Sequence, residues 1–154
     1  DQLAEIAIYH KKINKNKAIK RAIEVMDIVK LPSNRDIINS YPHELSGGMK
    51  QRIMIAISLM CEPDLIIADE PTTALDVTTQ SEILNIFNDL KKNLNIGLVL
   101  ISHNIGVIAE TSNELLVMKD GQILESGDTI KVLTKPKNEY TKHLLSCIPP
   151  WIGN

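Results

Sequence analysis

Aromatic residues and net charge are both scarce in this sequence of 154 residues. Phe, Trp and Tyr make up 3% of the chain, and the formal net charge at pH 7 is -2. Proteins that bind nucleic acid need a strongly basic surface for the phosphates, or aromatic side chains on which bases can stack. We therefore expect no nucleic-acid partner.

Cysteine clusters and long hydrophobic runs are missing as well. Cys61 and Cys147 lie far apart and form no CxxC or Cys/His cluster, which suggests neither a disulfide framework nor a metal site. We expect both to be buried or half-buried thiols in a reducing compartment. The longest mostly apolar run, from Ile53 to Cys61, is far shorter than the roughly 20 residues of a membrane helix. We expect a soluble chain that reaches a membrane only through a partner protein.

The composition that remains, 44% hydrophobic and 23% charged, is typical of one globular domain. Hydrophobic periodicity predicts helices from Ala18 to Val29, ended by Leu31-Pro32-Ser33, from Met49 to Met60, and from Thr78 to Leu94 with Asp76 or Thr78 as cap. Short apolar runs predict fully buried strands at Leu65–Ala68 and Leu98–Ile101. A strand, a helix and a strand in this order form a parallel crossover unit.

The last third of the chain predicts a hairpin followed by two short helices. The expected strands are Leu115–Met118 and Gln122–Glu125, joined by a tight turn at Asp120-Gly121 and added antiparallel to the same sheet. The helices are expected from Asp128, as cap, to Leu133, and from Glu139 to Ser146, with a stop at Ile148-Pro149-Pro150.

The stretch from Tyr41 to Asp76 carries the residue types of a phosphate site. Ser46 is a good N-cap for the helix that follows, and Gly47 and Gly48 let a ligand approach the backbone closely. A helix start presents free N–H groups and the positive end of the helix dipole. This pattern predicts an anion site suited to phosphate.

Polar residues follow both predicted strands at their carboxyl ends. Asp69 and Glu70 end the first strand, and His103 follows the second, so we expect all three at one edge of the sheet. One carboxylate there can hold Mg²⁺ through water while its neighbour accepts a proton from an attacking water. The histidine can stabilise the charge that develops during phosphoryl transfer. The alternatives are a loop with two solvated acids and a capped or surface histidine.

Taken together, these segments resemble the nucleotide-binding domain of ATP-binding cassette (ABC) transporters. The segments are LSGGMKQR at residues 45–52, LIIADEP at residues 65–71, ALD at residues 74–76, and SH at residues 102–103. The resemblance implies an α/β fold of the P-loop NTPase class, a parallel sheet core with helices, preceded by a helical subdomain.

The resemblance also implies the roles of individual residues toward ATP and Mg²⁺. Asp69 would hold Mg²⁺, Glu70 would be the catalytic base, and His103 the switch histidine. The implied nucleotide-binding residues are Ser46, Gly47, Gly48 and Gln51 of the signature loop and Asp76 of the D-loop. Asn104 stands where the family often has Asp.

The phosphate-cradling pattern G-x-x-x-x-G-K-[ST] occurs nowhere in the 154 residues. The glutamine loop is missing too, so the resemblance covers about the second half of a family domain, and we expect Asp1 to mark a truncation. We expect a helical subdomain at residues 1–60, the Walker B, D-loop and H-loop half of the core at 61–127, and a helical tail at 128–154. The chain alone is expected to lack ATPase activity and to leave a sheet edge unpaired.

The end of the chain resembles one group within this family, the importer ATPases for oligopeptides, dipeptides and nickel. It reads KPKNEYTKHLLS at residues 135–146 and then Ile148-Pro149, and it departs from that group at Asn138-Glu139. The resemblance implies a second ABC ATPase domain paired head to tail, transmembrane permease subunits, and a peripheral location on the cytoplasmic face of the membrane. Two alternatives stay open, a non-enzymatic interaction module that contributes only its signature loop and a non-transport ABC ATPase.

A basic cluster lies near the start of the chain. Its members are His10, Lys11, Lys12, Lys15, Lys17, Lys20 and Arg21. They could dock an acidic partner, although a solvated helix face is the more common arrangement.

Overall fold

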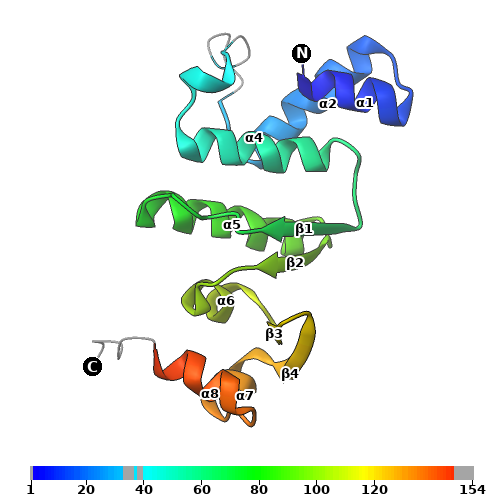
Figure 1. Ribbon diagram of the computed structural model, residues 1–154. Coiled ribbons are helices and arrows are strands. Elements are labelled where there is room, and N and C mark those ends of the chain that lie inside the picture. The colour runs from blue at the N-terminus through cyan, green and yellow to red at the C-terminus, as the bar shows by residue number, and fades with distance from the viewer. Residues whose placement is uncertain (1, 33–36, 38–39, 148–154) are drawn as a thin grey trace. The chain divides into compact units, whose positions relative to one another are not determined.

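The computed structural model describes residues 2–32, 37 and 40–147 (Figure 1). Contacts between Cα atoms divide the chain into two compact units, Asp1–Ile101 and Ser102–Asn154. Each unit has its own secondary structure and is described by itself. The three-part division expected from the sequence, at residues 60 and 127, stays a prediction. No helix in the described part of the chain is long and apolar enough to cross a membrane.

Four helices build most of the first unit's core. They are α1 (Gln2–Lys11), α2 (Lys15–Ile28), α4 (Gly47–Leu59) and α5 (Val77–Asn93). Helix α4 contacts the α1 and α2 pair on one side and α5 on the other (Figure 1). The largest fully buried side chains include Phe87 on α5 and Leu59 on α4. Because α4 and α5 both contribute buried side chains to this core, their packing sets the position of the start of α4 relative to α5.

The predicted helices of this unit are confirmed, with small shifts at their ends. Helix α2 buries Ala18, Ala22, Val25 and Met26, which lie at helical spacing. It starts at Lys15, because the Asn14 side chain accepts a hydrogen bond from the Lys17 N–H at 2.9 Å. It ends at Ile28, before Leu31 and Pro32, and Ser33 of the predicted stop lies outside the described residues.

Part of the basic cluster has a structural role within the first unit. Lys11 Nζ lies 3.0 Å from Glu62 Oε2, and Arg21 Nε lies 3.9 Å from Glu62 Oε1. The hydrogen bond from Lys11 and the positive charges of Lys11 and Arg21 lower the pKa of Glu62. These two cations of the cluster thus tie α1 and α2 to the segment after α4.

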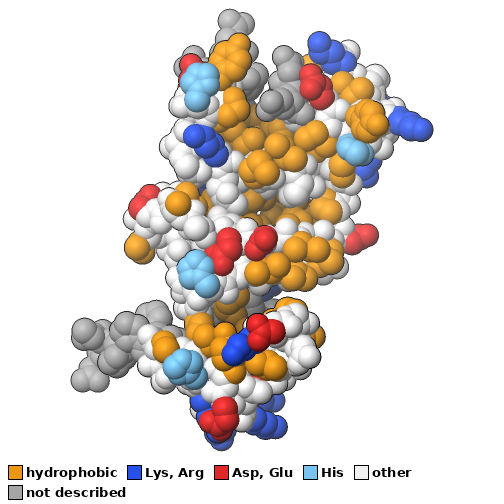
Figure 2. All heavy atoms as spheres, viewed as in Figure 1, with side chains coloured by type: hydrophobic (Ala, Val, Ile, Leu, Met, Phe, Trp, Pro, Cys, Tyr) orange, Lys and Arg blue, Asp and Glu red, His pale blue; other side chains and the backbone are white. Residues whose placement is uncertain are grey.

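Strands β1 (Leu65–Asp69) and β2 (Gly97–Ile101) pair in parallel, as predicted, from Leu65 opposite Gly97 to Asp69 opposite Ile101. The prediction that they are fully buried is wrong. Leu65 is 52% exposed and Ile67 66% exposed, while Ile66 and Ala68 are buried in the core. Alternate side chains of a strand point to opposite faces, and in the described part of this unit only one face packs on the core. Figure 2 shows hydrophobic side chains gathered over β1 and β2.

The second unit contains the predicted hairpin. Strands β3 (Glu114–Lys119) and β4 (Gln122–Asp128) are antiparallel. Asp120 and Gly121 form the turn with φ of 51° and 76°, the positive values that a two-residue hairpin turn requires. The expectation that these strands extend the first sheet is wrong, because in the described residues they pair only with each other. Mutual pairing satisfies the inner hydrogen bonds of both strands.

Helices α6 (Ile105–Thr111), α7 (Thr129–Thr134) and α8 (Glu139–Ser146) complete the second unit. The predicted cap Asp128 is confirmed, since it accepts a hydrogen bond from the Lys131 N–H at 3.0 Å. The stop predicted at residues 148–150 lies outside the described residues. Cys61 is half-buried as expected, whereas Cys147 is exposed, because it lies at the capping position after the last turn of α8.

The Glu125 carboxylate of β4 supports the start of α8. Its oxygens accept the N–H groups of Lys137 at 2.8 Å and Asn138 at 3.1 Å. The Thr141 side chain, and then the hydrogen bond from the Lys137 N–H, lower the pKa of this carboxyl group. The ionised form is therefore favoured in the folded state.

We predict that Glu125→Gln reduces the loss of stability on acidification. A lowered folded-state pKa contributes stability above the unfolded-state pKa of about 4.3, and this contribution is lost as the pH falls through the folded-state value. Urea unfolding at pH 6 and at pH 3 should show a smaller difference for the variant than for the wild type. Glu114→Gln, at an exposed position of β3, is the control and should keep the wild-type difference; equal behaviour of the two variants would contradict the account.

Candidate functional site

The start of α4 has the geometry of an anion site. Ser46 is the N-cap, and its hydroxyl accepts a hydrogen bond from the Met49 N–H at 3.2 Å, which confirms the predicted cap. The first N–H groups of a helix, here those of Gly47 and Gly48, have no partner within the helix. Ser46 and Gly47 are exposed, whereas Leu45 before them is buried and anchors the loop. This helix start can therefore present N–H groups to an anion from outside.

A short turn that the sequence did not reveal holds the chain before this loop. The 3₁₀ helix η1 (Pro42–Glu44) follows Tyr41, whose N–H donates to Glu44 Oε2 at 2.6 Å. The rings of Tyr41 and His43 are stacked with their centroids 5.7 Å apart. The loop thus enters α4 from a segment with its own local contacts.

The two predicted acids lie at the carboxyl end of β1. Asp69 is the last residue of the strand, and Glu70 follows with its N–H donating to the Ile101 carbonyl of β2 at 2.9 Å. The φ of Glu70 is 48°, in the left-handed region, which costs a residue with a side chain roughly 1 to 2 kcal/mol. Such strained positions cluster at functional sites.

Thr73 holds the side chain of Glu70. Its hydroxyl donates to Glu70 Oε2 at 2.7 Å, and its N–H donates to the Glu70 carbonyl at 3.2 Å. Sequence reasoning gave Thr73 no role, because a threonine in a turn carries no signal that points to a particular carboxylate. One oxygen of the Glu70 carboxylate is therefore oriented by the turn that follows it.

Asp76 ends the same turn and caps α5, one of the two options that the sequence left open. It accepts hydrogen bonds from the Thr79 N–H at 2.9 Å and from the Thr79 hydroxyl at 2.6 Å. The hydroxyl bond, and then the N–H bond, lower the pKa of Asp76, so the carboxylate form is favoured. Its predicted contact with nucleotide stays a prediction.

The turn before α5 and the start of α4 are in direct contact. A Cβ atom on Gly47 would lie 3.3 Å from Leu75 Cδ2, and one on Gly48 would collide with Thr79 Cγ2. The structure thus brings the predicted signature loop and the predicted D-loop together within one chain. No sequence pattern could show this contact, because it depends on how α4 and α5 pack.

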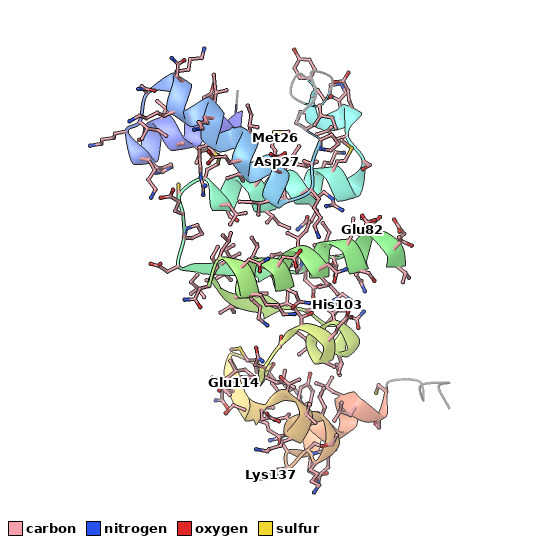
Figure 3. The ribbon with its side chains drawn as sticks, turned by 180° about the vertical axis from the view of Figure 1, so that it is seen from behind. Met26, Asp27, Glu82, His103, Glu114 and Lys137 are labelled. Atoms are coloured by element: carbon pink, nitrogen blue, oxygen red, sulfur yellow. The ribbon has the colours of Figure 1, made fainter. Side chains whose placement is uncertain are left out.

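Gln51 and Arg52 follow on the next turn of α4. Gln51 is half-buried, and its predicted nucleotide contact stays a prediction. The Arg52 guanidinium donates to the Val29 carbonyl at 2.8 Å and to Glu82 Oε2 at 2.7 Å, with only 12% of its side chain exposed. Arg52 therefore joins α4 to the end of α2 and to α5, on which Glu82 is labelled in Figure 3.

His103 belongs to the second unit, where it is exposed just after β2 (Figure 3). Asn104 after it caps α6, because its side-chain oxygen accepts the Gly106 N–H at 3.0 Å. Asn serves as an N-cap as well as Asp does, so the departure at this position preserves the cap. The proximity of His103 to Glu70 stays a prediction.

Asp69 is the candidate ligand for Mg²⁺. The described residues contain no group of three or more His, Cys, Asp or Glu side chains that could hold a metal ion. An exposed carboxylate at a strand end fits Mg²⁺, which is usually bound through one or two carboxylates together with waters and substrate phosphates. The donor set thus suits a metal that arrives with a nucleotide.

Comparison with known proteins identifies the family. The family model described as ABC transporter matches residues 3–73. The oligopeptide transport ATP-binding protein AppD of Bacillus subtilis (strain 168) is 44% identical over 149 residues, 97% of this chain. The chain belongs by homology to the ATP-binding proteins of ABC transporters. It spans 45% of the length of AppD, less than half of that protein.

Solved structures of ABC proteins share the fold of this chain. A dimeric ATP-binding cassette in a post-hydrolysis state, bound to ADP and Pi, matches with a TM-score of 0.65 and 30% identity, covering 76% of this chain and 49% of that one. The cbiO1 part of the ABC transporter complex cbiONQ from Clostridium perfringens matches with a TM-score of 0.72 and 27% identity, covering 86% and 51%. The mixed α/β fold is thus that of an ABC cassette, matched in part. The ABC family model includes Ser46, Asp69 and Glu70, whereas Asp76 and His103 lie beyond its last matched residue.

We predict that Gly48→Ala lowers the free energy of unfolding far more than Gly47→Ala does. The new Cβ at position 48 must displace Thr79, whose rotamer is held by its hydrogen bond to Asp76, whereas Leu75 can move its side-chain end away from position 47. Overpacking of this kind costs roughly 1 to 3 kcal/mol, and Gly47→Ala should change the free energy of unfolding by less than about 1 kcal/mol. Urea unfolding of both variants measures the difference, and equal values would contradict the contact.

Proposed function

We propose that this chain forms the signature-loop and catalytic-carboxylate part of the ATP-hydrolysing subunit of a peptide-importing ABC transporter. The observation that carries the proposal is the end of β1, where Glu70 is held in a left-handed conformation and its carboxylate is oriented by Thr73. A carboxylate that a hydroxyl holds in one direction suits a general base. The similarity to AppD, an oligopeptide transport ATP-binding protein, supports the peptide cargo. A nickel or metal-chelate cargo is the alternative.

The start of α4 would bind a nucleotide that a second ABC ATPase domain holds. Ser46, Gly47 and Gly48 present a hydroxyl and backbone N–H groups at the positive end of the helix dipole, and a terminal phosphate is the ligand that suits them. Gln51, one turn along α4, would border the same nucleotide. The dimeric state of the solved cassette bound to ADP and Pi supports a pair of ATPase domains, of identical or different subunits. The head-to-tail arrangement of this pair is what the family resemblance implies.

Glu70 would act as the general base in ATP hydrolysis. Its carboxylate accepts a proton from water as the water oxygen bonds to the γ-phosphorus, and the bond between that phosphorus and the β,γ-bridging oxygen breaks to leave ADP and phosphate. His103 would hydrogen-bond the γ-phosphate or the attacking water. Asp69 would hold Mg²⁺, which neutralises charge on the phosphates when bound. Asp76 would stand at the same interface as part of the D-loop.

The chain by itself is proposed to lack turnover. The 154 residues contain no G-x-x-x-x-G-K-[ST] pattern, so they provide no lysine and no glycine-rich cradle for the β- and γ-phosphates. Positioning and charge neutralisation by such a loop supply a large part of phosphoryl-transfer catalysis. The complete protein would work at the cytoplasmic face of the membrane, bound to transmembrane permease subunits. A role on nucleic acid fits poorly with a net charge of -2.

We predict that Glu70→Gln in the complete protein, assembled with its partner subunits, abolishes ATP turnover while ATP binding persists. The amide keeps the shape of the side chain but cannot accept the proton, and loss of a general base typically costs about 10² to 10⁴ in rate. Steady-state phosphate release and binding of a fluorescent ATP analogue measure the two properties.

The matched control is Asp64→Asn, at the residue just before the opposite end of β1. This residue is exposed, and the Gly97 N–H bonds to its backbone carbonyl, which the substitution leaves in place. It should keep wild-type turnover. Unchanged turnover in Glu70→Gln would remove Glu70 as the base and favour an interaction module that contributes only its signature loop.

A further inference from the structure

We infer that Thr79 is a positioning residue that couples the signature loop to the D-loop carboxylate of the same chain. The inference rests on the proposed function, because it concerns how the start of α4 is held when a nucleotide binds there. It is carried by two independent contacts of one side chain. The hydroxyl of Thr79 bonds to Asp76, and its methyl group lies against Gly48.

The hydroxyl contact fixes the direction of the Thr79 side chain. Its Oγ1 donates to Asp76 Oδ2 at 2.6 Å, while its N–H donates to Asp76 Oδ1 at 2.9 Å, so one residue engages both oxygens of the carboxylate. A β-branched side chain has few favourable χ1 rotamers in a helix. With Oγ1 bound to Asp76, the position of Cγ2 is determined as well.

The methyl contact sets the distance between α4 and the start of α5. A Cβ atom at Gly48 would collide with Thr79 Cγ2, so the space between the two residues has no room for a side chain at position 48. The N–H of Gly48 is one of the groups that have no partner within helix α4. Any inward shift of this loop must therefore push Thr79, and through its hydroxyl the carboxylate of Asp76.

A common N-cap explains only half of this arrangement. An aspartate that caps a helix needs the backbone N–H of the residue three positions later, and any residue except proline supplies that. The hydroxyl bond and the methyl contact go beyond the cap, and threonine is the residue that can provide both. The two roles can be separated, because Val keeps methyl groups without the hydroxyl and Ser keeps the hydroxyl without the methyl group.

Substitutions of Thr79 should leave the fold intact. One turn further along the same pair of helices, Arg52 of α4 and Glu82 of α5 are joined at 2.7 Å. Ile55 of α4 and Ile83 of α5 are both buried in the same core cluster. The packing of α4 on α5 thus has support that does not involve Thr79.

The test uses the complete protein with its partner ATPase and permease subunits. We predict that Thr79→Val lowers kcat for ATP by about tenfold or more with KM within about twofold, because the geometry of the bound state suffers while ground-state binding remains. Thr78→Val, the same change at the exposed preceding residue, is the control and should keep the wild-type kcat. Wild-type kcat and KM in Thr79→Val would overturn the inference.

A rescue experiment tests the methyl contact by itself. Gly48→Ala should reduce turnover, and adding Thr79→Ser should restore at least about half of it, because serine removes the colliding Cγ2 and keeps the bond to Asp76. Adding Thr79→Val should restore none. Equal turnover in the two double variants would overturn the coupling. Absence of ATP turnover in the wild-type complex would instead refute the proposed function.

Discussion

The close packing of the start of α4 on the start of α5 is the constraint on which the rest of the first unit depends. Gly48 meets Thr79 at a distance that permits no side chain, and Arg52 binds Glu82 one turn further on. Because α4 also contacts α1 and α2, the contact between α4 and α5 connects the helices at the beginning of the chain to the turn that carries Glu70 and Asp76. The anion site and the carboxylates thus share one support.

The turn between β1 and α5 stores strain where the chemistry is expected. Both Glu70 and Ala74 have positive φ, at 48° and 64°. Thr73 binds Glu70 through its side chain and its backbone, and Thr72, which is buried, accepts the Leu75 N–H at 3.3 Å. These bonds offset the conformational cost and hold the two ends of the turn in place. A rigid base suits catalysis, since a preorganised group needs no rearrangement during the reaction.

Local signals in the sequence predicted most elements of the fold. The caps Ser46 and Asp128, the turn at Asp120-Gly121 and the limits of α8 depend on neighbours within a few residues, and all are confirmed. The strands β1 and β2 were found, but a short apolar run cannot tell whether one or both faces are covered. The exposure of Ile67 could therefore not be predicted.

Contacts that leave no pattern in the sequence explain the remaining differences. The approach of Gly48 to Thr79 depends on the packing of two helices, and the bond from Thr73 to Glu70 depends on a turn with unusual φ values. Neither leaves a periodic pattern in the sequence. The order and spacing of the motifs, more than their residue types, predict a nucleotide site, because Ser and Asp also serve as ordinary helix caps. This assignment stays a prediction.

Hydrogen exchange at the start of α4 tests the central claim most directly. In the complete complex carrying Glu70→Gln, mass spectrometry of the peptide that spans residues 45–52 would compare ATP with ADP. We predict slower exchange with ATP alone, because its terminal phosphate accepts hydrogen bonds from the first N–H groups of α4. Equal exchange in the two states, with ATP shown to be bound, would contradict a phosphate-binding role for Ser46, Gly47 and Gly48.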